Sequence, residues 1–300
     1  MRKLIYVMGS SYSGSTLLTR LLASLPQVAS VGELKATAMG DIATYSCSCG
    51  ALLNDCSFWT QVKEEMARRG RIFTYDNFGT HFQADDHLTN RLLRWSIRGP
   101  IFEAIRGLGF VLSGSAKNTR QKIIEQNMAL IEIICNLLQA DTFLDDSKDP
   151  VRLKFFLGSG LWDIRTIHLI RDGRGVTNSY IRHNRSSMKT AVQEWVHAQQ
   201  ECDRMARSLG DRCLTIYYED LCLTPKTILS AIHKFIGFND PCEELNCLKQ
   251  DHHILGNQMR LGTLQEIRLD EKWKQSLSPE QLLIFDDIGG ELNRSYGYRQ

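Results

Sequence analysis

Long apolar runs are absent from the 300-residue sequence. No window approaches the roughly 18 uncharged apolar residues that a membrane-spanning helix requires. The apolar run Leu4–Met8 near the N-terminus is too short for a signal peptide, and no small-residue cleavage site follows it. We therefore expect no transmembrane segment and, if residue 1 is the native start, a cytoplasmic protein.

The sequence also lacks a strong excess of charge of either sign. Its 36 Lys and Arg residues and 34 Asp and Glu residues give a formal net charge of +2. This balance gives no reason to expect a nucleic-acid partner or a membrane surface, so any anion-binding site must be local. Hydrophobic residues make up 43% of the chain and charged residues 23%, as in a globular enzyme with a substantial core.

A third absence lies in the glycine-rich stretch GSSYSGST, residues 9–16. Gly9 and Gly14 stand where a phosphate-binding loop has its two glycines, and Thr16 stands where that loop has Ser or Thr. A nucleotide triphosphatase has lysine at the position occupied here by Ser15 and uses it to reach the β and γ phosphates. The loop therefore does not fit magnesium–ATP chemistry.

Backbone N–H groups of such a loop, together with the dipole of the following helix, still suit an anion. Further hydroxyl donors come from Ser10, Ser11, Ser13, Ser15 and Thr16. Two interpretations remain open. Either the loop is a turn without a ligand, or it binds a nucleotide with less charge at its 5′ end, such as a phosphosulfate.

Short apolar runs alternate with helical patterns along the chain. Strands are predicted at residues 3–8, 141–148, 166–170 and 213–221, and helices at residues 15–25, 176–183 and 224–238. This alternation predicts an α/β fold with a P-loop-type parallel sheet flanked by helices. Ligands of such sheets bind beyond the carboxyl ends of strands, and the glycine-rich stretch follows one of these ends.

Residues 60–140 differ from the rest of the chain. They have helical patterns such as QKIIEQNMALIEIICNLLQA (residues 121–140) and little strand character. We interpret residues 1–300 as a single domain in which 60–140 form a helical insertion over the active site, acting as an acceptor lid.

From Ser13 onward the loop matches the 5′ motif P-(R/K)-S-G-(S/T)-T, and in this the sequence resembles the sulfotransferase family, in particular the branch with bacterial and protein-tyrosine sulfotransferases. The resemblance implies binding of 3′-phosphoadenosine 5′-phosphosulfate (PAPS), with 3′,5′-ADP as product and no catalytic metal. It assigns the 5′ end to Ser11, Ser13, Gly14, Ser15 and Thr16. One departure is that Tyr12 replaces the basic residue. Its hydroxyl can donate to the bridging oxygen but cannot supply charge.

A second anion-binding motif is HLIRDGRGVTNSYIR, residues 168–182. Arg171 ends a predicted strand and Ser179 lies about two turns into the next helix, so the two can converge on one anion. The family's 3′-phosphate motif has the same spacing, which implies that these residues distinguish PAPS from ATP. The alternative is that Arg171 pairs with the adjacent Asp172.

Three further motifs contain candidates for the missing charge and for enclosure of the nucleotide. Lys148, in DDSKDP, matches a lysine that contacts the phosphosulfate in tyrosine-sulfating relatives, unless it is only solvated. Tyr218, in YYEDL, matches a residue that encloses adenine, unless it is only core. Arg260, in ILGNQMRLG, matches a basic loop that closes over the nucleotide, unless it is a surface residue.

Attack by an acceptor hydroxyl is helped by a general base. Glu33, in SVGEL, matches a glutamate with this role in tyrosine- and carbohydrate-sulfating relatives; the alternative is an exposed residue at a helix start. His183 and His168 are weaker candidates, and His168 lies inside a predicted strand.

Nine cysteines are many for a cytoplasmic protein. Cys47, Cys49 and Cys56 cluster in CSCGALLNDCSFW, residues 47–59, and three interpretations stay open for them. They can bind a structural metal together with a distant Cys or His, form a disulfide, or pack as small hydrophobic residues.

The predicted function is transfer of a sulfuryl group from PAPS to an acceptor hydroxyl by in-line displacement. The acceptor is a sugar, a lipid, a phenol or a peptide tyrosine. The alternatives are a degenerate P-loop kinase and a non-catalytic adenine-nucleotide-binding protein.

Overall fold

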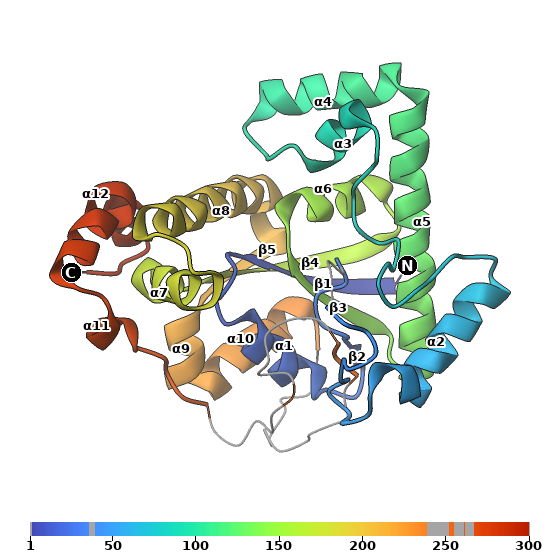
Figure 1. Ribbon diagram of the computed structural model, residues 1–300, viewed down its shortest axis with the longest axis horizontal. Coiled ribbons are helices and arrows are strands. Elements are labelled where there is room, and N and C mark those ends of the chain that lie inside the picture. The colour runs from blue at the N-terminus through green and yellow to red at the C-terminus, as the bar shows by residue number, and fades with distance from the viewer. Residues whose placement is uncertain (1, 36–39, 239–251, 255–260, 262–266, 300) are drawn as a thin grey trace. The chain divides into compact units, whose positions relative to one another are not determined.

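The computed structural model describes residues 2–35, 40–238, 252–254, 261 and 267–299 (Figure 1). Two compact units are distinguished. The first comprises the described parts of residues 1–7, 16–166 and 242–263, and the second those of residues 8–15, 167–241 and 264–300.

The strands that the structure describes form one five-stranded parallel sheet of order β2-β3-β1-β4-β5. They are β1 (Arg2–Gly9), β2 (Val28–Ala29), β3 (Thr142–Lys148), β4 (Trp162–Ile170) and β5 (Cys213–Tyr217). Val28 lies opposite Thr142 in the parallel β2–β3 pair. Residues 4–8 of β1 are at most 1% exposed, as expected for a strand covered on both faces. The predicted α/β fold with a parallel sheet flanked by helices is confirmed.

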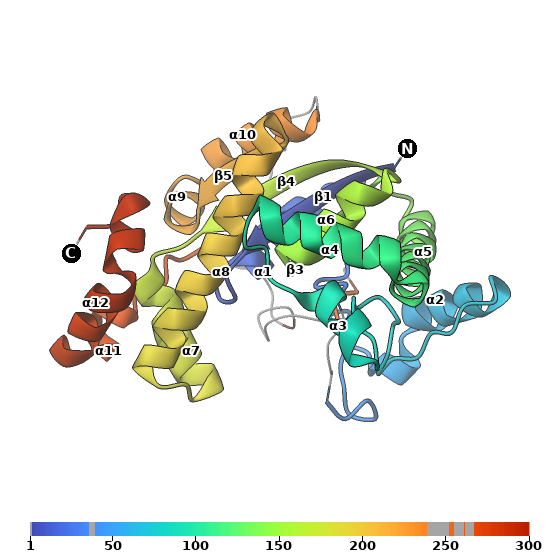
Figure 2. The same ribbon diagram turned by 90° about the horizontal axis from the view of Figure 1, so that it is seen from above.

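The first unit has helices on both sides of its strands (Figures 1 and 2). Its described helices are α1 (Ser15–Ala23), the short 3-10 helix η1 (Leu53–Asp55), α2 (Ser57–Arg68), α3 (His87–Arg94), α4 (Pro100–Leu112), α5 (Gly114–Leu137) and α6 (Pro150–Ser159). Helices α2, α3 and α4 pack on the long helix α5. The stretch 60–140 thus contains most of α2 together with α3, α4 and α5, and its role as an acceptor lid remains a prediction.

The second unit has a core of three packed helices, α7 (Gly173–Asn184), α8 (Met188–Leu209) and α12 (Pro279–Ser295). Trp195 of α8 is fully buried among them, and Cβ atoms built on Gly173 and Gly289 would lie 2.6 and 3.0 Å from its ring. The unit also contains η2 (Gly210–Arg212), α9 (Tyr218–Leu223), α10 (Pro225–Ile236) and α11 (Trp273–Ser276).

The strand predicted over residues 213–221 is shorter in the structure. Strand β5 ends at Tyr217, and Tyr218 begins helix α9. Glu219 and Asp220 lie in the first turn of α9, where carboxylates interact favourably with the helix dipole. This local effect ends the strand within the YYEDL motif.

No helix within the described ranges is both long enough and apolar enough to cross a membrane.

Candidate active site

The loop between β1 and α1 contains buried hydroxyl groups. Ser10, Ser13 and Ser15 are at most 5% exposed, whereas Ser11 is exposed and Thr16 is half-buried. Among the residues that the structure describes, the Oγ atoms of Ser10 and Ser13 have no hydrogen-bond partner. Buried polar groups are normally paired, so these two hydroxyls fit a loop that binds a polar ligand. The N-terminus of α1, at Ser15, adds N–H donors.

Two glycines are required in this loop for steric reasons. Gly14 has a φ of 93°, and a Cβ atom there would lie 2.3 Å from the ring of Tyr218. A Cβ atom on Gly9 would lie 2.6 Å from the main-chain oxygen of Leu169. Only glycine tolerates both the positive φ and the close approach at position 14, so the loop packs closely on Tyr218.

Arg171, at the end of β4, lies against the same loop. Its Nη1 donates a hydrogen bond of 2.9 Å to the main-chain oxygen of Tyr12. Its guanidinium carbon lies 4.5 Å from the centre of the Tyr218 ring, a cation–π contact. Arg171 is only 6% exposed. The second unit therefore brings together Arg171, Tyr218 and the glycine-rich loop, three of the elements predicted to bind the nucleotide.

Asp172 does not pair with Arg171, contrary to the alternative interpretation of the motif. Its carboxylate accepts a hydrogen bond from the main-chain N–H of Arg174 and caps α7. It also pairs with the guanidinium of Arg174 at 2.6 Å. The two arginines of the R-D-G-R motif thus have separate partners.

Asp270 is a partner of Arg171 that sequence reasoning missed. Arg171 Nη2 donates to the main-chain oxygen of Asp270 at 2.9 Å and lies 3.3 Å from its carboxylate. The main-chain N–H of Asp270 donates to the hydroxyl of Tyr218. Burial opposes ionisation of Asp270, but hydrogen bonding from Lys272 and the charge of Arg171 lower its pKa. Asp270 thus fixes the orientation of both Arg171 and Tyr218.

Ser179 and Arg171 both adjoin Gly175 of helix α7. The hydroxyl of Ser179 donates to the main-chain oxygen of Gly175 at 3.0 Å. A Cβ atom on Gly175 would lie 3.2 Å from Nε of Arg171. Glycine at this position leaves room for the guanidinium beside the first turns of α7.

The side chain of Tyr12 is directed toward the C-terminal end of α7. Its hydroxyl donates to Asn184 at 2.6 Å, and its ring stacks on His183 with the centroids 5.4 Å apart. The residue has a φ of 61°, a left-handed conformation that is uncommon for side-chain-bearing residues. In this structure the group of Tyr12 that contacts Arg171 is its main-chain oxygen.

In the first unit, Lys148 and Glu33 form an ion pair at the end of β3. Lys148 Nζ lies 2.5 Å from Oε1 of Glu33, and it also donates to the main-chain oxygen of Asp146 at 3.2 Å. Their side chains are 13% and 31% exposed. Burial alone would lower the pKa of Lys148, but attraction to Glu33 and Asp146 raises it. The lysine therefore stays charged.

Asp146 was also missed by sequence reasoning. It is 3% exposed, and burial, reinforced by repulsion from Glu33, raises its pKa to about 6 although Lys148 opposes the shift. Titratable groups with strongly shifted pKa values cluster at functional sites. The paired aspartates of DDSKDP were the available signal.

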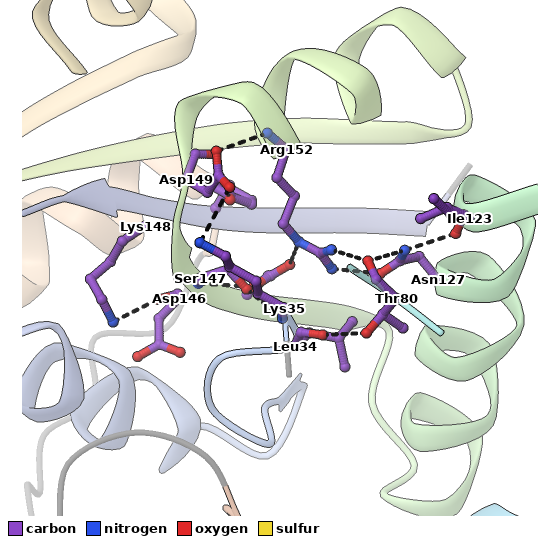
Figure 3. Close-up of polar contacts among 12 residues, drawn as sticks. Leu34, Lys35, Thr80, Ile123, Asn127, Asp146, Ser147, Lys148, Asp149 and Arg152 are labelled. Atoms are coloured by element: carbon purple, nitrogen blue, oxygen red, sulfur yellow. Dashed lines mark hydrogen bonds and ion pairs between the residues drawn. The ribbon is translucent and has the colours of Figure 1, made fainter. Parts of the chain in front are cut away.

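A buried network on the other side of β3 fixes the position of these groups (Figure 3). Arg152, 1% exposed, donates to the carboxylate of Asp145 at 3.0 Å and to the main-chain oxygen of Thr80 at 2.7 Å. Because side chains alternate along a strand, Asp145 belongs to this network while Asp146 and Lys148 face the other way.

Hydrogen bonds also tie the segment after Glu33 to β3 and to Thr80. The main-chain N–H of Lys35 donates to Ser147 Oγ at 2.9 Å, and Thr80 Oγ1 donates to the main-chain oxygen of Leu34 at 2.7 Å (Figure 3). Lys148 itself has a φ of 65°. Its neighbour Asp149 caps α6, so the left-handed turn at Lys148 is held from both sides.

Arg260 lies outside the described residues. The roles predicted for the other site residues remain predictions, but their positions form two sets. Arg171, Ser179, Tyr218 and the loop belong to one set, and Glu33 and Lys148 to the other.

A model of the sulfotransferase family matches residues 116–241. The protein-tyrosine sulfotransferase of Drosophila melanogaster is 32% identical over 102 residues, which cover 30% of this chain and 20% of that relative. The chain therefore matches only a fifth of the length of this curated relative.

Solved sulfotransferase domains have the same fold. The domain from the olefin synthase of Synechococcus PCC 7002 superposes with a TM-score of 0.53 at 18% identity, covering 100% of this chain and 97% of that one. The domain from the curacin biosynthetic pathway gives a TM-score of 0.51 at 19% identity, covering 96% and 98%. The family model, the curated relative and the fold together confirm the resemblance of this chain to the sulfotransferase family.

Proposed function

We propose that this protein transfers a sulfuryl group from PAPS to the hydroxyl of an acceptor. The observation that carries the proposal is the hydrogen bond from Arg171 to the main chain of Tyr12. It joins the motif expected to bind the 3′-phosphate to the loop expected to bind the 5′ end. The family of the matched model and the name of the Drosophila relative support sulfuryl transfer.

The residues of the second unit fit an adenosine that is phosphorylated at its 3′ and 5′ positions. Ser10 and Ser13 offer buried hydroxyls, and the N-terminus of α1 offers N–H donors to the 5′ group. Arg171 and Ser179 would hold the 3′-phosphate, and the ring of Tyr218 would pack on the base. A guanidinium matches phosphate geometry through two parallel hydrogen bonds.

The ion pair of the first unit fits proton transfer and charge stabilisation. PAPS supplies an electrophilic sulfur; as the acceptor oxygen bonds to it, the bond from sulfur to the 5′-phosphate oxygen breaks and 3′,5′-ADP leaves. Glu33 has one carboxylate oxygen paired with Lys148 and a side chain that solvent reaches, so its second oxygen can take the acceptor proton as a general base. Attraction to Glu33 and Asp146 raises the pKa of Lys148, so this side chain is a candidate for stabilising negative charge on the departing phosphate oxygen. No metal is required for these roles.

A hydroxyl on a peptide tyrosine is the first acceptor to test, because the curated relative is a protein-tyrosine sulfotransferase. Sugars, lipids and small phenols stay as further candidates. We propose the helices of residues 60–140 as the acceptor lid of a single-domain enzyme. A cytoplasmic location remains a prediction.

The decisive experiment is thermal-shift titration with 3′,5′-ADP and with 5′-ADP, each with and without magnesium. A ligand at 100 times its dissociation constant stabilises a protein by about 2.7 kcal/mol. We expect the larger shift with 3′,5′-ADP and no effect of magnesium. Equal shifts, or a shift that needs magnesium, would favour the kinase alternative and reject PAPS specificity.

Release of 3′,5′-ADP from PAPS should then be measured with a panel of tyrosine peptides, phenols, sugars and lipids. Acceptor-dependent release supports a transferase. Tight binding of 3′,5′-ADP without release by any member of the panel would favour the non-catalytic alternative.

A further inference from the structure

Four potential metal ligands converge in the first unit, outside the proposed active site. The Sγ atoms of Cys47, Cys49 and Cys56 and a ring nitrogen of His252 all lie within 4.8 Å of one another. The Cys49–Cys56 sulfur separation is 3.7 Å, and Nδ1 of His252 lies 3.8 Å from Cys47 Sγ and 3.6 Å from Cys56 Sγ.

The three pair distances of 3.6–3.8 Å are close to the edges of a tetrahedral zinc site. Zinc–sulfur bonds of about 2.3 Å and zinc–nitrogen bonds of about 2.0–2.1 Å give ligand edges of roughly 3.8 Å between sulfurs and roughly 3.5 Å between sulfur and nitrogen. A disulfide requires a sulfur–sulfur bond of about 2.0 Å, and all three cysteines are free thiols. Packing alone gives no reason for an imidazole nitrogen to contact two buried sulfurs with a third close by.

We propose that Cys47, Cys49, Cys56 and His252 bind one zinc ion. Three cysteines and one histidine form a closed, four-coordinate set that leaves no position for substrate, which is typical of structural rather than catalytic zinc. His252 supplies the fourth ligand that the local sequence could not provide.

The fold presents the cysteines on a tight turn. The main-chain N–H of Cys47 donates to the main-chain oxygen of Ala51, and that of Gly50 donates to the main-chain oxygen of Cys47. Gly50 has a φ of 91°, which glycine adopts at little cost. Cys56 precedes the first residue of α2, so a rigid element also holds the third thiol.

Contacts around the ligands fix His252, which lies 196 residues after Cys56. Its ring stacks on Phe58 with centroids 4.3 Å apart, and its main-chain oxygen accepts a hydrogen bond from the indole of Trp59 at 3.0 Å. The main-chain N–H of Ser48 donates to the main-chain oxygen of His253 at 3.0 Å. Such surrounding contacts orient metal ligands.

By binding His252 together with the three cysteines, the ion would link residues 252–254 to the segment 47–59. Metal binding to a folded site adds its free energy to that of folding, and here it would link parts of the chain that are far apart in the sequence. This proposal is independent of the proposed nucleotide chemistry.

The test is the metal content of the full chain, purified with a reductant and without chelators. Elemental analysis should find one zinc ion per chain, and replacement by cobalt should give the thiolate-to-cobalt and ligand-field absorption of tetrahedral coordination. Cys49→Ser and His252→Asn should lose the zinc, whereas Cys213→Ser, a change at a half-buried thiol outside the cluster, should retain it.

A second measurement applies if the variants fail to fold. In the wild-type protein, mass spectrometry should find the three cluster cysteines protected from alkylation until a chelator removes the zinc. Absence of both zinc and a cobalt spectrum would overturn the proposal. So would a disulfide between two cluster cysteines in the purified protein, or full zinc content in His252→Asn.

Discussion

The guanidinium of Arg171 donates a hydrogen bond to the main-chain oxygen of Tyr12, 159 residues earlier in the chain. The same guanidinium lies over Tyr218, whose ring closes on Gly14. One arginine thus contacts both the loop and the aromatic residue expected beside the nucleotide. Changes at Arg171 should therefore affect binding at more than one point of the ligand.

Replacing Arg171 by alanine should weaken binding of 3′,5′-ADP by about 10- to 100-fold, because hydrogen bonds to charged groups contribute about 1.5–3 kcal/mol. Arg171→Lys should recover part of this loss, since lysine keeps the charge but not the planar fork. Isothermal titration calorimetry measures both affinities.

The matched control is Arg174→Ala, which removes the other arginine of the motif and its pair with Asp172. It should change affinity much less. Equal losses of affinity for 3′,5′-ADP in the two variants would contradict a specific role of Arg171 in binding the nucleotide.

Gly14→Ala should destabilise the fold by about 1–3 kcal/mol, because the added Cβ meets Tyr218 at 2.3 Å and the residue has a φ of 93°. The control is Gly158→Ala in α6, where a Cβ meets nothing within 4 Å. That change should be neutral or stabilising. Urea unfolding compares the two variants, and equal stabilities would contradict the packing described for the loop.

Glu33→Gln should lower the turnover number by roughly 100- to 10,000-fold, the usual contribution of a general base. Binding of 3′,5′-ADP should change little. Steady-state kinetics with the acceptor found in the panel, together with thermal shifts, separates the two effects. Unchanged turnover would exclude Glu33 as the base, without affecting the assignment of Arg171.

Asp146 should make stability depend on pH between about 4 and 6. Its pKa rises from the ordinary 3.8 to about 6 in the folded protein. A raised folded-state pKa favours folding below pH 4, and this advantage is lost as the pH rises through 6. The shift corresponds to at most about 3 kcal/mol.

In Asp146→Asn that contribution is absent. The stability of the variant relative to wild type should therefore increase between pH 4 and pH 7, as measured by denaturant unfolding at each pH. Asp211→Asn, at an exposed position, serves as the control. A constant difference across this range would show that Asp146 does not titrate there.

The parallel sheet, and the places of the glycine-rich loop and of Arg171 at the ends of its strands, could be predicted because they depend on short stretches of sequence. Buried apolar runs indicate the strands, and the glycines of residues 9–16 and the arginine ending β4 stand next to such runs. Their partners could not be predicted. Asp270 lies 99 residues after Arg171 and His252 lies 196 residues after Cys56, and no local pattern links such distant positions.

Asp146 shows a different limit. Alternation along β3 requires Asp145 and Asp146 to face opposite sides of the sheet. The sequence does not indicate which aspartate pairs with a buried arginine and which lies beside the Lys148–Glu33 ion pair. The buried partner Arg152 decides this by pairing with Asp145. The direction of the Tyr12 side chain likewise depends on tertiary packing, against Tyr180 and His183.

Tyr12 and Lys148 both adopt a backbone conformation that glycine or asparagine would occupy more readily. A redesign aimed at heat tolerance, guided by backbone preference alone, would select those residues at both positions. It would thereby remove Tyr12, which stands in the loop where a basic residue was expected. It would also remove Lys148, the lysine that lies outside the loop at the end of β3. A thermostable version made to test the proposed function should therefore keep positions 12 and 148 unchanged and seek its gains elsewhere.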